Sequence, residues 1–252
     1  MNFPKIVFKA MDIESNIKLV KWAFSQGNGD LSVHDYTIKT FPELIKLDSN
    51  SSEEDIDNLI RKVIVGCYEN SSELINSSVE RYNKLWDKYN DIYFKMLSDF
   101  LGVEFPSNIK EIEASVGFTP VHPRNVHDFS FCLAPNVRDS KLIQTCAHET
   151  LHFLWFKKWR KMYPETSRSN FDSPYMEWRY SEMVTDPILN NKPFNELFDF
   201  TEKGYDSFYD LHDGDEFVMD KLRNIYSTDD SIENKISNGY EYICNYFNSK
   251  VK

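Results

Sequence analysis

Apolar side chains recur every three or four positions along the first 104 residues, which is the spacing of one face of an α-helix. The spacing is clear in ESNIKLVKWAF (14–24) and continues in two longer stretches further along. The polar segment LDSNSSEED (47–55) interrupts it, and its Ser and Asp side chains can accept hydrogen bonds from the first N–H groups of a helix. We predict a mainly helical N-terminal region, residues 1–104, in which KIVFKA (5–10) can form a short strand.

A different pattern begins after residue 104. In HDFSFCLAP (127–135), large apolar residues alternate with small ones, as in a half-buried strand, and IKEIEASVGF (109–118) is also expected to be a strand. Further helices are predicted at 140–162, near 173–190 and at 231–247. A second region, residues 105–252, therefore mixes strands and helices, and the whole chain is predicted to have an α+β fold that is mainly helical.

The amino-acid composition limits the kinds of molecule that the protein is expected to bind. The chain has 252 residues with 41% hydrophobic and 15% aromatic content, which is typical of a globular protein. Its net charge of −11 argues against binding to nucleic acid. No run of 18 apolar residues indicates a membrane span, and the N-terminus has no signal-peptide pattern. Four scattered cysteines without a CxxC pair are expected to be free thiols, so we expect a cytoplasmic protein.

The helix predicted at 140–162 contains the sequence HETLH, residues 148–152. His148 and His152 are four positions apart, so their imidazoles lie on one helix face and can bind one Zn²⁺ ion. Glu149 follows the first histidine directly, where a carboxylate can reach a water molecule beside the metal and act as general base. The alternative is a helical histidine pair that binds no metal, because three fixed residues are a weak pattern.

A catalytic zinc ion takes three protein ligands and leaves one position for water. The third ligand is expected in EWRYSEMVTDPIL (177–189), where Glu182 and Asp186 are four residues apart on a predicted helix. Alternative third ligands are Glu177, His212 and, less favoured by its position, Asp172.

With these motifs, the chain resembles the gluzincin metallopeptidases, the thermolysin-like clan, over residues 125–190. That family has HExxH on one helix and an ExxxD pattern on a second. The resemblance implies that the zinc ligands are His148, His152 and Glu182. It also implies that Glu149 is the general base and that Asp186 accepts a hydrogen bond from His148, which would orient this imidazole.

The resemblance further implies a zincin-like core with a small mixed or antiparallel sheet beside the HExxH helix. HDFSFCLAP (127–135) would be the edge strand that lines a substrate cleft and binds an extended peptide. Glu182 follows His152 by 30 residues, a longer interval than in thermolysin itself. No third histidine and no glycine turn follow HETLH, which excludes the metzincin pattern.

Peptide hydrolysis also needs a donor for the negative charge that develops on the carbonyl oxygen. The resemblance implies a Tyr or His downstream of the third ligand. The sequence offers several such residues, of which Tyr209 and His212 are the chosen candidates; the others are Tyr205 and Tyr240.

These expectations together describe a zinc-dependent peptidase that acts on a peptide or protein substrate. A different class of function is also consistent with the sequence, namely a zincin-fold binding or regulatory module without catalysis. The presence of Glu149 favours the enzyme, because a metal site with a purely structural role does not require a carboxylate beside it.

Overall fold

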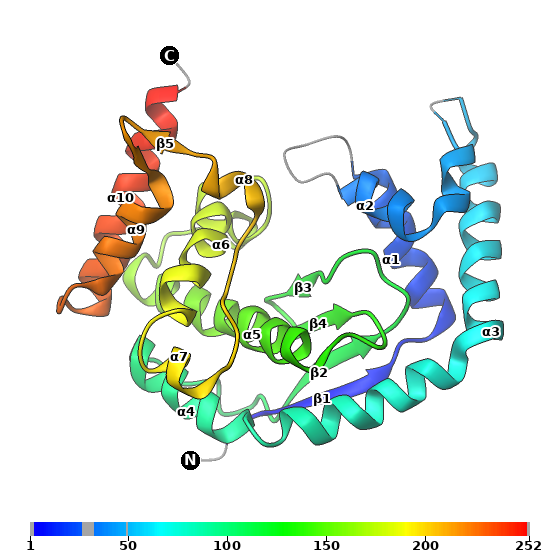
Figure 1. Ribbon diagram of the computed structural model, residues 1–252, viewed down its shortest axis with the longest axis horizontal. Coiled ribbons are helices and arrows are strands. Elements are labelled where there is room, and N and C mark those ends of the chain that lie inside the picture. The colour runs from blue at the N-terminus through cyan, green and yellow to red at the C-terminus, as the bar shows by residue number, and fades with distance from the viewer. Residues whose placement is uncertain (1–2, 27–32, 49, 251–252) are drawn as a thin grey trace. The chain divides into compact units, whose positions relative to one another are not determined.

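The computed structural model describes residues 3–26, 33–48 and 50–250 (Figure 1). The α+β, mainly helical fold is confirmed. In chain order, the elements are β1 (Lys5–Ala10), α1 (Ile13–Ser25), α2 (Val33–Thr40), the 3₁₀ helix η1 (Pro42–Lys46), α3 (Glu53–Trp86), α4 (Asn90–Leu101), β2 (Glu111–Val116), β3 (Arg124–Asn125), β4 (Ser130–Leu133), α5 (Asp139–Met162), η2 (Arg168–Phe171), α6 (Met176–Leu189), α7 (Phe194–Leu197), α8 (Asp206–Tyr209), β5 (His212–Asp213), β6 (Glu216–Phe217), α9 (Val218–Ser227) and α10 (Ile232–Lys250). Among the described residues, no helix combines the length and the apolar character needed to cross a membrane.

The chain forms two compact units, each built from separate parts of the sequence. Of the described residues, the sheet unit contains those in 4–89 and 109–142, and the metal unit contains residue 3, residues 90–108 and residues 143–250. These units do not coincide with a division at residue 104. The reason is that β1, near the N-terminus, pairs in parallel with β2 and so joins residues 5–10 to residues 111–116.

The sheet unit contains a mixed sheet with the strand order β1-β2-β4-β3. The strands β1, β2 and β4 are parallel, and β3 is antiparallel to β4. Alternate residues of β4 are buried, namely Phe131 and Leu133, as the period-two pattern predicts. The sequence prediction that this segment is an edge strand is wrong, because β3 pairs with β4 on the side away from β2. The chain reverses between them at Asn125, whose side chain accepts hydrogen bonds from the N–H groups of His127 and Asp128.

The helices of the sheet unit begin where the sequence offers capping side chains. Ser52 caps α3 by accepting a hydrogen bond from the Asp55 N–H, and Asp55 in turn accepts one from the Ser52 N–H. The long helix α3 packs against both α1 and β1 (Figure 1). It contains a kink at Ser71, so the two helical stretches predicted around this position are joined.

The metal unit is mainly helical. Helix α6 packs against α9 and α10, and these two helices also contact each other (Figure 1). Helix α5 contributes two fully buried tryptophans, Trp155 and Trp159, which pack against the ring of Tyr180 on α6. Helix α4 is joined to α5 by the Tyr93 hydroxyl, which donates a hydrogen bond to the Ala147 carbonyl at 2.6 Å. The residues around HETLH are therefore held by packing on several sides.

Gly239 marks a close approach between α10 and α6. A Cβ atom at this position would overlap the Tyr180 hydroxyl, which already contacts the Tyr226 hydroxyl at 2.9 Å and the Ile236 carbonyl at 3.1 Å. We expect Gly239→Ala to lower the free energy of unfolding by about 1–3 kcal/mol, because the neighbouring groups cannot move without losing these contacts. Urea denaturation measures the change.

The matched control is Gly66→Ala, in the interior of α3, where an added Cβ meets nothing within 4 Å. This substitution is expected to stabilise the protein by about 0.5–1 kcal/mol, since alanine is the better helix former. Equal stability of the Gly239→Ala variant and the parent protein would contradict the close helix packing described here.

Candidate metal centre

Two histidines of α5 and one glutamate of α6 meet inside the metal unit. His148 and His152 are one helical turn apart, and their Nε2 atoms are 3.1 Å from each other. Glu182 approaches from α6, with Oε2 at 3.4 Å from Nε2 of His148 and Oε1 at 3.7 Å from Nε2 of His152. The predicted grouping of these three residues is therefore present, and it could hold a metal ion.

These atoms lie close enough together to hold one metal ion. Ligand atoms at 2.0–2.1 Å from a tetrahedral centre are separated from one another by about 3.3–3.4 Å. The two Nε2 atoms are 3.1 Å apart, and Glu182 approaches them through different oxygens, Oε2 at 3.4 Å from His148 and Oε1 at 3.7 Å from His152. With one ligand atom taken from each residue, the three atoms lie within 4.8 Å of one another. Two imidazoles and one carboxylate are also the ligand types that zinc binds in catalytic sites. The residue types therefore suit zinc, and their closeness would allow them to share one ion.

The hydrogen bond made by Nδ1 of His148 leaves Nε2 as the nitrogen that faces the cluster. Nδ1 of His148 is 2.8 Å from Oε1 of Glu202. An ionised carboxylate can only accept, so Nδ1 carries the proton and donates this hydrogen bond. In the neutral imidazole, Nε2 is then the unprotonated nitrogen, and it faces His152 and Glu182. This is the tautomer that a metal ligand requires.

The site attracts positive charge. Burial by itself lowers the pKa of His148, but the carboxylates of Glu202 and Glu182, with a contribution from Glu149, outweigh it and raise the pKa to about 10. Glu182 and Glu202 are 2% exposed, so water screens their charges little. A cation at Nε2 of His148, either a proton or a metal ion, is therefore strongly stabilised.

The exposure of the cluster is uneven. The His148 side chain is 17% exposed, whereas those of His152 and Glu182 are 0% and 2% exposed. Solvent therefore reaches the cluster at His148. Glu149, the next residue, is 7% exposed, and its charge contributes to the raised pKa of His148.

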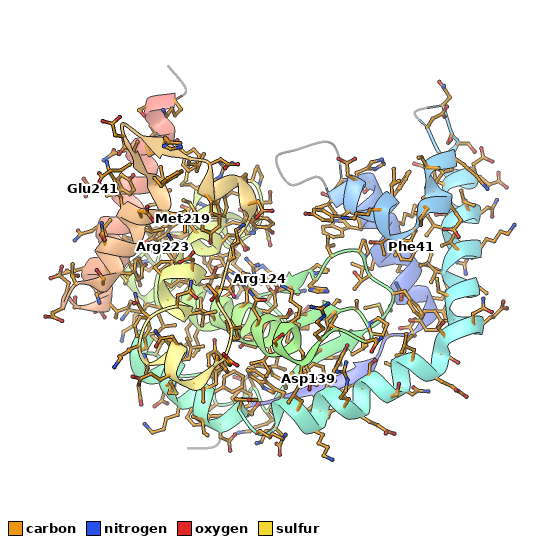
Figure 2. The ribbon with its side chains drawn as sticks, viewed as in Figure 1. Phe41, Arg124, Asp139, Met219, Arg223 and Glu241 are labelled. Carbon is orange, nitrogen blue, oxygen red and sulfur yellow. The ribbon has the colours of Figure 1, made fainter. Side chains whose placement is uncertain are left out.

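The predicted contact between Asp186 and His148 is wrong. Asp186 accepts hydrogen bonds from the Tyr209 hydroxyl at 2.6 Å and from two nitrogens of Arg223 at 2.7 and 3.0 Å. Arg223 extends from α9 and is labelled in Figure 2. The charged guanidinium satisfies the buried carboxylate of Asp186, which is 1% exposed, and thereby joins α6 to α9. Glu202 has taken the position beside His148 instead.

The other candidate residues do not join the cluster. His212 is exposed on β5, where its ring packs against Phe217. The Tyr209 hydroxyl is engaged by Asp186 and by the N–H of Gly204 at 3.0 Å, and its pKa is raised, chiefly by burial and then by Asp186. Burial raises the pKa of Tyr240 and of Cys244, and the charge of Glu177 adds a smaller contribution to both. Asp172, at the end of η2, is exposed.

Two residues of the site were absent from the sequence prediction. Gln144 precedes His148 by one helical turn, so the i, i+4 spacing on α5 could have indicated it. Its Nε2 donates to Oε2 of Glu202 at 3.0 Å. Glu202 lies in the irregular segment between α7 and α8, where no periodic pattern relates it to the motif.

Comparison with known proteins adds no family to this description. No protein-family model matches the chain, and no curated protein and no solved structure is similar to it.

Proposed function

We propose that this chain is a zinc-dependent peptidase with a gluzincin-like site. The observation that supports the proposal most directly is the convergence of His148, His152 and Glu182, whose ligand atoms lie within 4.8 Å of one another. Three protein ligands leave a fourth position, as catalytic zinc sites do and closed structural sites do not. Glu149, which is not among the three ligands, supplies the general base that such chemistry needs.

A zinc ion held there would polarise the carbonyl of a peptide and lower the pKa of a water molecule to near neutrality. Glu149 takes a proton from the attacking water and delivers it to the nitrogen of the leaving amine. Its side chain is 7% exposed, so the base would act with little competition from bulk water. The partial exposure of His148 is consistent with the approach of a substrate from solvent.

Peptides are the proposed substrates because the residues present suit amide hydrolysis. The HExxH motif with a glutamate on a second helix is the pattern of peptidases, and this chain has both parts at the site. The departure from that pattern concerns the residue that contacts His148, which is Glu202 and not Asp186. The ligands and the base are unaffected by this difference, so the reaction type is still the one proposed.

The test is hydrolysis of a mixture of unrelated peptides, followed by mass spectrometry. We expect cleavage products with the purified protein, loss of cleavage after treatment with a chelator, and recovery when zinc is added back. Cleavage that survives complete removal of metal would show a different mechanism. Metal binding without cleavage of any peptide would instead support the second class of function, a binding or regulatory module.

A further inference from the structure

Both carboxylate oxygens of Glu202 accept hydrogen bonds, although the residue lies in a segment without helix or strand. Its side chain is 1% exposed, and each carboxylate oxygen has a partner on α5. Oε1 accepts from Nδ1 of His148 at 2.8 Å, and Oε2 accepts from Nε2 of Gln144 at 3.0 Å. The two partners are one turn apart on the same helix, so the carboxylate is held from two points of α5.

The backbone of Glu202 is held separately, by Asn190. The Asn190 side chain accepts a hydrogen bond from the Glu202 N–H at 2.7 Å and donates one to the Glu202 carbonyl at 2.9 Å. Asn190 is the C-cap of α6, the helix that carries Glu182. This pair of hydrogen bonds needs one donor and one acceptor in a planar group, which among common side chains only the amides of Asn and Gln offer.

The segment also touches α6 beside the metal ligand. A Cβ atom at Gly204 would lie 3.3 Å from the backbone carbonyl of Glu182, which is tighter than an ordinary contact. The absence of a side chain at Gly204 therefore allows the chain after Glu202 to pass close to α6. Contacts at Asn190 and Gly204 thus fix the segment on both sides of Glu202.

We propose that Glu202 is the positioning residue for the metal ligand His148, and that Asn190 acts through Glu202. Helix α6 then contributes twice to the metal site, directly through Glu182 and indirectly through its C-cap. A carboxylate bound to Nδ1 fixes the imidazole ring in rotation and increases the basicity of Nε2. This inference rests on the metal site of the proposed function but not on peptidase activity.

The experiment measures zinc affinity by competition with a chromophoric chelator, using Glu202→Gln and Glu202→Ala in the full-length chain. Glutamine keeps a neutral acceptor for Nδ1–H, whereas alanine removes it. We expect binding about 10–100-fold weaker in Glu202→Gln and weaker still in Glu202→Ala. The control is Asp186→Asn, which is expected to bind zinc like the parent protein because Asp186 contacts Tyr209 and Arg223.

A second readout distinguishes positioning from a general loss of stability. With Co²⁺ at saturating concentration, the visible absorption bands report the ligand field of the bound ion. We expect these bands to shift in Glu202→Gln and to be unchanged in Asp186→Asn. An effect that came only from weakened folding would leave the bands of the loaded protein unchanged, and this result would overturn the proposal.

The role of Asn190 is tested by a double-mutant cycle. Asn190→Ala alone is expected to weaken zinc binding in the same direction as Glu202→Ala. The double variant is expected to bind no more weakly than Glu202→Ala alone, because Asn190 acts through a carboxylate that is already missing. Additive losses would overturn the indirect role of Asn190.

Failure of this inference and failure of the proposed function give different results. Parent-like zinc affinity in both Glu202 variants would overturn the positioning role and leave the three ligands in place. Equal weakening by Asp186→Asn and Glu202→Gln would also overturn it. Absence of zinc binding by the parent protein would remove the metal site, and with it the proposed function as well.

Discussion

Zinc bound to the purified protein, at about one ion per chain, is expected to be lost in Glu182→Ala. Zinc sites with four protein ligands bind with roughly 10–16 kcal/mol, so one ligand contributes on the order of 3 kcal/mol, or about 100-fold in affinity. Glu182 is buried and approaches both imidazoles within 3.7 Å, so no other carboxylate can replace it without a shift of α6. Metal content is measured by plasma mass spectrometry after dialysis against a chelator.

Glu177→Ala is the matched control, because it removes the same side chain five residues earlier on the same helix. The charge of Glu177 contributes, after burial, to the raised pKa values of Tyr240 and Cys244. Glu177 is not one of the residues that meet at His148. This variant is expected to retain the parent zinc content. If Glu182→Ala retained zinc and Glu177→Ala lost it, the third ligand would be Glu177, and the assignment of Glu182 would be wrong.

Glu149→Gln is expected to lower the rate of peptide hydrolysis by roughly 10²–10⁴-fold while zinc content stays unchanged. Glutamine has nearly the same shape but cannot take a proton from water. Because Glu149 is not a ligand in the cluster, its substitution leaves the three metal contacts in place. Rates are compared on whichever peptide of the mixture the parent protein cleaves fastest.

The control for this prediction is Glu241→Gln, on the exposed side of α10 (Figure 2). It makes the same chemical change away from the cluster and is expected to leave the rate unchanged. Full activity in Glu149→Gln would require another base and would contradict the assignment of Glu149.

The histidine pair of the candidate site could be predicted from helix spacing, whereas Glu182 was predicted from the resemblance to the gluzincin pattern. His148 and His152 are separated by one turn of α5, and Glu182 lies on a second helix whose apolar stripe is readable. Periodicity defines the face on which a side chain lies. It therefore supports statements about which residues of one helix can act together.

Asp186 shows where spacing alone is insufficient. It satisfies the ExxxD pattern after Glu182, yet Arg223 and Tyr209 bind its carboxylate. Both partners come from elements further along the chain, and the competition between His148 and Arg223 for a carboxylate depends on tertiary structure. The contact of Glu202 with His148 was not predicted because Glu202 lies in an irregular segment, which has no periodicity from which contacts can be inferred.

The positions of the strands in the sequence were predicted more completely than the pairing of each strand with its neighbours in the sheet. The segments KIVFKA and HDFSFCLAP contain β1 and β4, but strand order depends on pairings between residues distant in sequence. The two-residue strand β3 has no alternation to detect, and its presence is what removes β4 from the edge. Helix α9 was also missed, because its stripe of buried residues is short and follows an acidic segment.

The positions of the site residues along the chain set the order in which the centre is completed during synthesis. Translation makes His148, His152 and Glu182 before Glu202, and Arg223 appears later still. A nascent chain that ends shortly after α6 has all three ligands but lacks the carboxylate that contacts His148. With the proposed ligands and the proposed role of Glu202, we expect tight metal binding only after the segment held by Asn190 has left the ribosome.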